Sequence, residues 1–149
     1  MIDDFERMGL VGRGDCWEVR RDAENGLVAV RLTGAIDDSG SAAWREAVAS
    51  ADPRALFMDA TGSTAATSLS SRAALAVFIR NLVARDVRVE VIANEHMSIV
   101  CRTVMRLAGA QNVMVIKRHE APQALRQAIT SAVTPLRSAS LTAPSRPSP

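Results

Sequence analysis

A hydroxyl-rich segment just before a predicted helix is the part of this chain best suited to hold an anion or accept a phosphate. The segment follows a short apolar run and a loop of small residues, and its candidate residues are Thr67, Ser68, Ser70, Ser71 and Arg72. The free N–H groups and the dipole of a helix N-terminus favour a phosphate, and Arg72, one turn further on, would add a positive charge. The same hydroxyls also cap helices that bind no ligand. A switch or anion-binding surface and a purely structural cap are therefore both open interpretations.

A second group of polar residues stands where strands of an α/β sheet are expected to end. Asp59 lies near the end of the apolar run 55–60, and Asn94 and His96 follow the clearest strand pattern, at 87–93. Because ligands collect at such strand ends in open parallel sheets, these three residues form a candidate ligand loop. A capping aspartate and a solvated histidine are the simpler alternatives.

The chain offers few of the side chains on which enzymes usually depend. It has two histidines, two cysteines and no tyrosine, and neither histidine is paired in sequence with a nucleophile. Gly62 with Ser63 and Thr64 lacks the second glycine and the lysine of a nucleotide-binding loop. Cys16 and Cys101 are too few for a disulfide framework or a structural metal site. We therefore expect a protein that is not an enzyme and has no cofactor and no metal.

Charge and hydropathy exclude two broad classes of partner. The 149 residues carry 18 basic and 16 acidic side chains, and residues 1–133 balance at 16 of each because Arg137 and Arg146 stand in an acid-free end. A nucleic-acid binder needs a broad basic surface, so no nucleic-acid partner is expected. No run approaches the roughly 18 apolar residues of a membrane span. Since the start is acidic where a secretory signal is basic, the sequence predicts a cytoplasmic protein without a membrane partner.

The elements that must position these residues alternate between strand and helix patterns. The turn dipeptide Asn25-Gly26 separates two apolar runs and predicts a hairpin. Strands are expected at 16–20, 27–32, 55–60, 87–93 and 113–116, and helices at 42–49, 70–85, from 98 to before Gly109, and from 122. This order, β-β-α-β-α-β-α-β-α, predicts a single α/β domain with a mixed, mostly parallel sheet of about five strands and about four helices.

The helix expected at 70–85 has the plainest apolar face. Its apolar residues recur with the period of a helix that packs on a sheet. They are Leu75, Phe78, Ile79, Leu82 and Val83.

The two ends of the chain have separate expectations. Residues 1–15 form an N-terminal extension with apolar residues but no clear pattern, which would pack across a sheet edge or make a homodimer contact. Residues 134–149 are rich in Ser, Pro and Ala and lack an apolar period, so this tail is expected to be disordered. The domain itself is placed at 1–133.

From residue 55 onward, the order and spacing of these patterns resemble the STAS domain, which bacterial anti-sigma-factor antagonists share with the cytoplasmic ends of sulfate transporters. The run Ala55-Leu56-Phe57-Met58-Asp59-Ala60-Thr61-Gly62 is similar to that family's central strand, and 87–93 to the next strand. The segment Val100-Cys101-Arg102-Thr103-Val104-Met105-Arg106-Leu107-Ala108-Gly109-Ala110 is similar to its spaced apolar helix, which closes in a small residue, a glycine and an apolar residue. Residues 113–116, with Ala121 and Ala124-Leu125, fit the final strand and closing helix.

The resemblance points to the hydroxyl-rich segment as a regulatory turn. In the antagonists, an aspartate-serine-serine-glycine turn holds a serine that a partner kinase phosphorylates at the N-terminus of the next helix. Aligned from Asp59, Ser68 takes the place of the acceptor serine, Thr67 that of the aspartate and Ser70 that of the glycine. A register shifted to Ser70-Ser71 does not restore the aspartate or the glycine either.

On this resemblance we expect a non-catalytic regulatory protein that acts by protein–protein binding. The partner would be an anti-sigma factor or a related serine kinase, and the contact surface would include 67–72. The alternative is a STAS-like or lipid-carrier-like binder of a small apolar or anionic ligand, with Met97, Met105 and Met114 lining its pocket.

Overall fold

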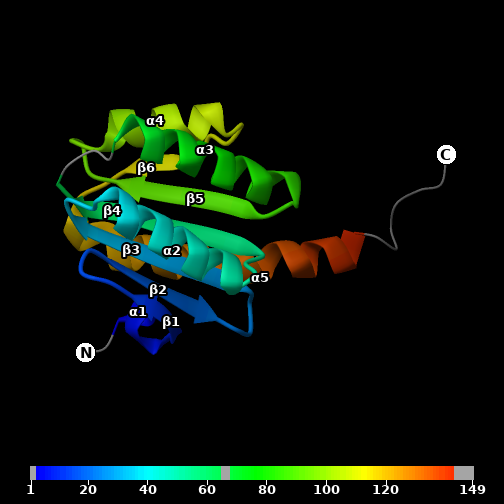
Figure 1. Ribbon diagram of the computed structural model, residues 1–149. Helices are drawn as coiled ribbons and strands as arrows, with labels where there is room; N and C mark the ends of the chain where they lie inside the picture. The colour runs from blue at the N-terminus through cyan, green and yellow to red at the C-terminus, as the bar shows by residue number, and fades with distance from the viewer. Residues whose placement is uncertain (1–2, 65–67, 143–149) are drawn as a thin grey trace.

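The computed structural model describes residues 3–64 and 68–142, and the side chains of residues 3–64 and 68–131 (Figure 1). Within these residues six strands form one sheet in the order β1-β2-β3-β4-β5-β6. The strands are β1 Gly9–Arg13, β2 Trp17–Asp22, β3 Leu27–Gly34, β4 Ala55–Ser63, β5 Arg88–Ala93 and β6 Val113–Val115. The α-helices are α1 Asp4–Arg7, α2 Asp38–Ser50, α3 Leu69–Ala84, α4 Ser98–Leu107 and α5 Ala121–Thr142, with a 3-10 turn at Arg118–Glu120.

The sheet is mixed and mostly parallel, so the predicted α/β architecture is confirmed. β1, β2 and β3 pair antiparallel, whereas β3, β4, β5 and β6 pair parallel. The strand and helix beyond the expected numbers both come from the N-terminal extension, which forms α1 and the edge strand β1. Phe5 and Met8 are buried with residues of β3 and β4, so the extension packs across the sheet edge. A homodimer contact there stays a prediction.

Helices cover both faces of the sheet, which explains why β3 and β4 have nearly continuous apolar sequences. α2, α3 and α4 lie over one face, and α5 lies behind the other (Figure 1). Neighbouring residues along a strand point to opposite faces, so Leu56 and Met58 pack under α2 and α3 while Phe57 packs under α5.

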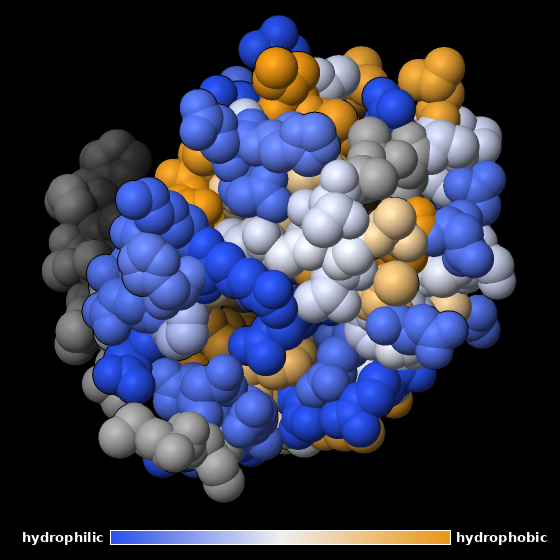
Figure 2. Space-filling view, turned by 90° about the vertical axis from the view of Figure 1, so that its left-hand side faces the viewer, coloured by the Kyte–Doolittle hydropathy of each residue, from blue (hydrophilic) through white to orange (hydrophobic). Residues whose placement is uncertain are grey.

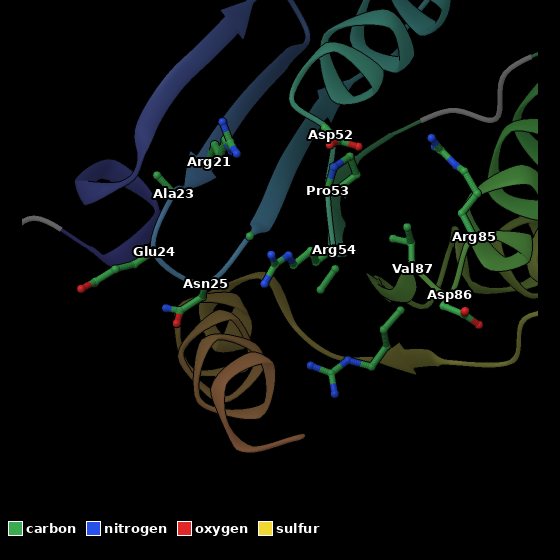
Figure 3. A pocket seen from close by; sticks show the side chains of 13 residues that line it. Arg21, Ala23, Glu24, Asn25, Asp52, Pro53, Arg54, Arg85, Asp86 and Val87 are labelled. Carbon is green, nitrogen blue, oxygen red and sulfur yellow. The ribbon is translucent and has the colours of Figure 1, made fainter. Parts of the chain in front are cut away.

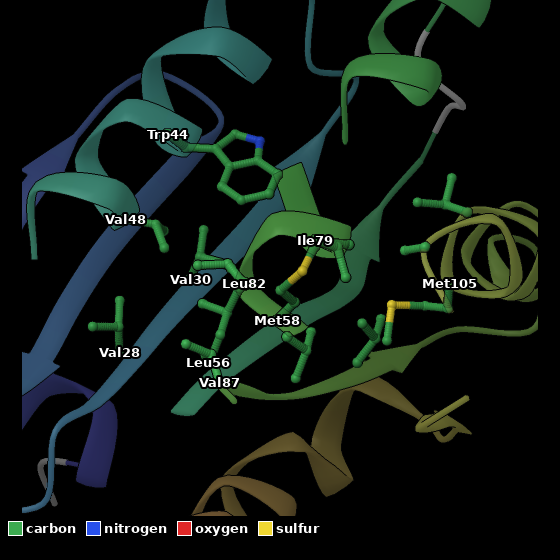
Figure 4. Packing of buried hydrophobic residues seen from close by; sticks show 14 of the residues in the cluster. Val28, Val30, Trp44, Val48, Leu56, Met58, Ile79, Leu82, Val87 and Met105 are labelled. Atoms are coloured by element: carbon green, nitrogen blue, oxygen red, sulfur yellow. The ribbon is translucent and has the colours of Figure 1, made fainter. Parts of the chain in front are cut away.

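The larger core lies between the sheet and the three helices α2, α3 and α4 (Figure 4). Trp44 of α2 is 1% exposed and meets Phe78 of α3 edge to face, with ring centroids 6.1 Å apart. Ile79 and Leu82, from the predicted apolar face of α3, are also fully buried. The helical period in the sequence therefore identifies the face of α3 that packs on the sheet.

The ends of the helices follow from local chemistry. Asp37 caps α2 by accepting a hydrogen bond from the N–H of Gly40 at 2.7 Å, and Ser68 caps α3 in the same way. Gly109 adopts φ +78° after α4, where a residue without a Cβ is favoured. These caps fix the first residues of α2 and α3. Both helices therefore start at the edge of the sheet where the parallel strands β3 and β4 end.

Helix α5 runs to Thr142 and therefore into the tail for which the composition predicts disorder. A helix that begins at Ala121 can continue into a segment of this composition, because each further residue adds one backbone hydrogen bond. The disorder of the tail stays a prediction. The remainder of the tail, 143–149, lies outside the described residues.

None of the helices in the described ranges combines the length and the apolar character that crossing a lipid bilayer would require.

Candidate functional site

Ser68 stands at the N-terminus of α3, where the sequence places the candidate switch. Its Oγ accepts a hydrogen bond from the backbone N–H of Ser71 at 3.1 Å and lies 3.1 Å from the Oγ of Ser70. Ser68 and Ser70 are exposed, whereas Ser71 is buried. Ser68 thus caps the helix and still presents its hydroxyl to solvent. Thr67, predicted as part of the same segment, lies outside the described residues.

A carboxylate from a different helix completes this group. Asp38, the first residue of α2, accepts hydrogen bonds at Oδ1 from the hydroxyls of Ser68 and Ser71, each at 2.7 Å. We call Asp38, Ser68 and Ser71 the Asp38 cluster. It joins the first turns of α2 and α3, although thirty or more residues separate the partners along the chain.

The hydrogen bonds of the Asp38 cluster favour the charged form of its carboxylate. The donations from Ser68, and then from Ser71, lower the pKa of the Asp38 carboxyl below its ordinary value. Asp38 therefore carries a full negative charge at neutral pH. A second negative group placed on Ser68 would stand within hydrogen-bonding distance of it.

Two large apolar side chains are exposed where α3 and α4 begin. Leu69 is 77% exposed and Ile99 is 75% exposed, and each lies in the first turn of its helix. We call Ser68, Leu69, Ser70 and Ile99 the α3–α4 tip. Figure 2 views the molecule from the end at which the parallel strands finish, and separate apolar patches stand at its top, where α3 and α4 lie, on an otherwise largely hydrophilic surface. Leu69 and Ile99 are therefore both accessible to a partner.

Arg72 lies beside an apolar cavity and not simply in solvent. The cavity, of about 60 Å³, lies between the sheet and helices α2, α3 and α4, and Arg72, Ser63 and Ser41 are its polar lining residues. Met97 and Met105 line it as predicted, but Met114 is 53% exposed on β6 and does not. Met114 lies outside the cavity because it stands on the edge strand β6, and a ligand held by Met97 and Met105 stays a prediction.

Cys101 also lines this cavity, and burial raises the pKa of its thiol to about 11. A thiol with that pKa is protonated at neutral pH, and the protonated form is a poor nucleophile. Cys101 therefore contributes packing rather than reactivity.

Asp59 lies on the opposite face of the sheet from the Asp38 cluster. Its Oδ1 accepts hydrogen bonds from the backbone N–H of Thr61 at 3.0 Å and from the Thr61 hydroxyl at 2.6 Å. The pairing of β3 with β4 shifts by one residue just after Asp59, so this carboxylate supports an irregular strand end. Arg31 lies 3.8 Å from Asp59 and stacks on the ring of Phe5, which places both on the α5 face.

Asn94 connects two strand ends. Its Nδ2 donates to the carbonyl oxygens of Thr61 at 3.0 Å and Ser63 at 2.9 Å, while its Oδ1 accepts from the N–H of Met97 at 2.8 Å. All the polar atoms of this side chain are thus used to hold β4 to the start of α4. His96, two residues on, is exposed.

The predicted site residues therefore separate into two groups. Ser68, Ser70 and Ser71 come together around Asp38, whereas Asp59 points to the other face and Asn94 holds the backbone. Across residues 3–64 and 68–131, no three side chains of His, Cys, Asp or Glu are grouped as a metal site would need.

The sequence interpretation did not identify Asp38 or Leu69 as part of this site. No local pattern links Asp38 to Ser68, because their contact depends on how α2 and α3 pack. The exposure of Leu69 could have been predicted from the sequence. This large apolar residue lies outside the apolar stripe that Leu75, Ile79 and Leu82 form on the helix.

Comparison with known proteins assigns no family. A scan against protein-family models gives no match to this chain, and neither does a search of the curated proteins. The structure shows an α/β fold with a mixed six-stranded sheet, and the function is argued from the site itself.

Proposed function

We propose that this protein is a non-catalytic regulator of STAS-like fold that binds another protein through the α3–α4 tip and is switched by phosphorylation of Ser68. One observation carries the proposal. The exposed hydroxyl of Ser68, at the cap of α3, is hydrogen-bonded to Asp38 and stands next to Leu69, which is 77% exposed. An acceptor hydroxyl, a helix N-terminus and an apolar contact group thus occur together.

The apolar groups of the α3–α4 tip account for binding in the unphosphorylated form. Burying a leucine or isoleucine side chain against a partner contributes about 1.5–3 kcal/mol, so Leu69 and Ile99 would be the anchors. The short hydroxyls of Ser68 and Ser70 leave the anchors accessible. The resemblance of the sequence to the STAS domain implies that the partner is an anti-sigma factor or a related serine kinase.

Phosphorylation would change this surface through charge. A phosphate adds roughly −1.5 to −2 charges at neutral pH, and the N–H groups at the start of α3 would donate hydrogen bonds to its oxygens. The modified Ser68 oxygen loses its hydrogen, so it can no longer donate to Asp38, whose carboxylate would then repel the new anion. The phosphate would both charge the apolar tip and break the link between α2 and α3, and both effects oppose partner binding.

The experiment is an affinity capture with matched variants as baits. Tagged wild-type protein, Leu69→Asp and Leu10→Asp are recovered from the cells that make the protein, and the co-purifying proteins are identified by mass spectrometry. Leu10 is 52% exposed on β1, at the far edge of the sheet, so its variant controls for an added surface charge. We expect one kinase-like regulator with the wild type and Leu10→Asp, and its loss with Leu69→Asp.

The switch is tested in the same capture. Ser68→Asp should lose the partner, whereas Ser68→Asn, which caps a helix equally well without a charge, should keep it. The wild-type bait should carry phosphate on Ser68 in part of the sample. If Leu69→Asp recovers the same partner as the wild type, or if no bait recovers one and Ser68 is unmodified, the proposal is wrong.

The apolar cavity supports a second candidate, a binder of a small apolar ligand. Met97, Met105 and Trp44 line it, with Arg72 among its few polar groups. Its volume of about 60 Å³ is well below the roughly 150 Å³ of a cavity that holds benzene. An acyl chain would therefore require α4 to move away from the sheet. Native mass spectrometry of the purified protein tests this candidate, because a bound ligand adds a discrete mass that denaturation removes.

A further inference from the structure

A wide hollow lies at the end of the sheet away from Ser68. It is a groove of about 710 Å³ formed by the turn between β2 and β3, the loop between α2 and β4, and the loop between α3 and β5 (Figure 3). Four of the residues that line it are arginines, and we call it the arginine groove. They are Arg21, Arg54, Arg85 and Arg88.

The backbone holds these three loops to one another. The N–H of Arg54 donates to the carbonyl of Gly26 at 2.9 Å, and the carbonyl of Arg54 accepts from the N–H of Arg88 at 3.3 Å. Gly26 has φ +67°, and a Cβ there would lie 2.9 Å from the Arg54 side chain. The arginines therefore project from a backbone that hydrogen bonds already hold in place. This order in the backbone lowers the entropic cost of binding a ligand.

The two helix–strand loops have the same construction. Asp52 and Asp86 both adopt left-handed backbone conformations, with φ of 49° and 63°, directly after α2 and α3. In each loop an arginine follows two residues later, Arg54 after Asp52 and Arg88 after Asp86. The sharp reversal thus brings equivalent arginines to the starts of two neighbouring parallel strands.

Most of the positive charge in the groove has no internal counter-ion. Among the described residues, Arg21, Arg54 and Arg85 are exposed and make no side-chain hydrogen bond or ion pair, and Arg88 makes only a 3.8 Å contact with Glu90. In Figure 3 the Arg54 side chain extends toward Asn25, and the carboxylate of Asp86 points away from it. The lining also holds the carboxylates of Glu24 and Asp52, and none of these three acidic groups forms an ion pair with Arg54.

We propose that the arginine groove binds a small molecule that carries two or more phosphate groups. The planar guanidinium matches phosphate oxygens with paired N–H donors, and such charge-assisted bonds are among the strongest hydrogen bonds in proteins. In Figure 3 the side chains of Arg21, Arg54 and Arg85 stand apart around the groove, so separate phosphate groups would meet them. The balanced charge of residues 1–133 argues against a nucleic acid, which needs a broad basic surface. This site is separate from the α3–α4 tip and does not depend on the proposed function.

Inorganic tripolyphosphate is the probe, and the full chain is titrated with it by isothermal calorimetry at low salt. Arg54→Gln and Arg21→Gln each remove one groove charge, and Arg102→Gln removes one exposed charge from α4 as the matched control. We expect saturable binding that each groove variant weakens about tenfold or more, while the control changes it less than about twofold. Sulfate at the same concentration should bind much more weakly.

Amide chemical shifts locate the site independently of affinity. Addition of tripolyphosphate should move the resonances of residues 21–26, 52–55 and 85–88, and leave those of 68–72 unchanged. The circular dichroism of the exposed arginine variants should match that of the wild type. The proposal is overturned if tripolyphosphate does not bind at millimolar concentration, if Arg102→Gln weakens binding as much as Arg54→Gln, or if the shifts cluster elsewhere.

Discussion

The Oγ of Ser68 and the Oδ1 of Asp38 lie 2.7 Å apart and join the first turn of α3 to the first turn of α2. The turn before α3 has no aspartate of its own in the described residues, and α2 brings a carboxylate to the same hydroxyl. This contact couples two properties of one site. The group that would accept a phosphate is also part of the link between two helices that cover the same face of the sheet.

Charge at position 68 should weaken this link. Ser68→Asp and Ser68→Asn both keep a capping side chain, but the aspartate stands beside the Asp38 carboxylate. We expect Ser68→Asp to melt at a lower temperature than Ser68→Asn, and the gap to narrow as salt is raised. Ser68→Ala, which lacks the cap, should lower the free energy of unfolding by about 1 kcal/mol. Equal melting of the aspartate and asparagine variants at low salt would contradict the proposed repulsion.

The Asp38 cluster should give the protein a pH-dependent contribution to stability. Hydrogen bonds lower the pKa of the Asp38 carboxyl in the folded state. The charged carboxylate therefore stabilises the fold at pH values above the ordinary pKa of 3.8, and this stabilisation is lost as the pH falls through the lower pKa of the folded state. Denaturant unfolding of the wild type and Asp38→Asn between pH 6 and pH 3 measures this. The wild type should be more stable at pH 6, and the difference should shrink toward pH 3. A difference that is constant with pH would show that the charge of Asp38 contributes nothing.

Two leucines of α3 form a matched pair for the proposed contact surface. Leu82 is 1% exposed in the core, and Leu69 is 77% exposed at the α3–α4 tip. Leu82→Ala should lower the free energy of unfolding by about 2–5 kcal/mol, whereas Leu69→Ala should change it by less than about 0.5 kcal/mol. Urea unfolding of both variants tests the burial directly. A large loss with Leu69→Ala would mean that this side chain packs in the protein itself.

Asp86 should be replaceable by glycine with a gain in stability. Its φ of 63° costs a side-chain-bearing residue about 1–2 kcal/mol, and the extra freedom of glycine in the unfolded chain cancels part of that. We expect Asp86→Gly to raise the free energy of unfolding by about 0.5–1 kcal/mol and Asp86→Val to lower it. Asp86→Asn, which tolerates this conformation and removes the charge, separates backbone strain from electrostatics.

Asn94 should not tolerate a carboxylate. In Asn94→Asp, an oxygen replaces the Nδ2 that donates to the carbonyls of Thr61 and Ser63. We expect a loss of about 1–3 kcal/mol at pH 7, measured by denaturant unfolding. The loss should diminish at low pH, because the facing carbonyls raise the folded-state pKa of the new carboxyl and its protonated form can donate again. Asn94→Ser, which is neutral, should show no such recovery.

Local patterns in the sequence predicted most of the architecture, but not helix α1 or the edge strand β1. The apolar runs at 27–32 and 55–60 predicted two strands, and the second run predicted a strand covered on both faces. The spacing of Leu75, Ile79 and Leu82 predicted the buried face of α3. Such predictions succeed because strand and helix periods act over a few residues. The same locality identified the hydroxyls around Ser68 as residues at the start of a helix.

The composition of the site was decided only by tertiary packing. Asp38 meets Ser68 across thirty positions, Asp59 turns to the opposite face from the hydroxyls, and the arginines of the groove come from three loops that are distant in sequence. The sequence by itself determined which residues could form hydrogen bonds and which could be buried. The tertiary structure decided which of them meet, because a contact between distant residues depends on how helices and strands pack and on no pattern within either segment.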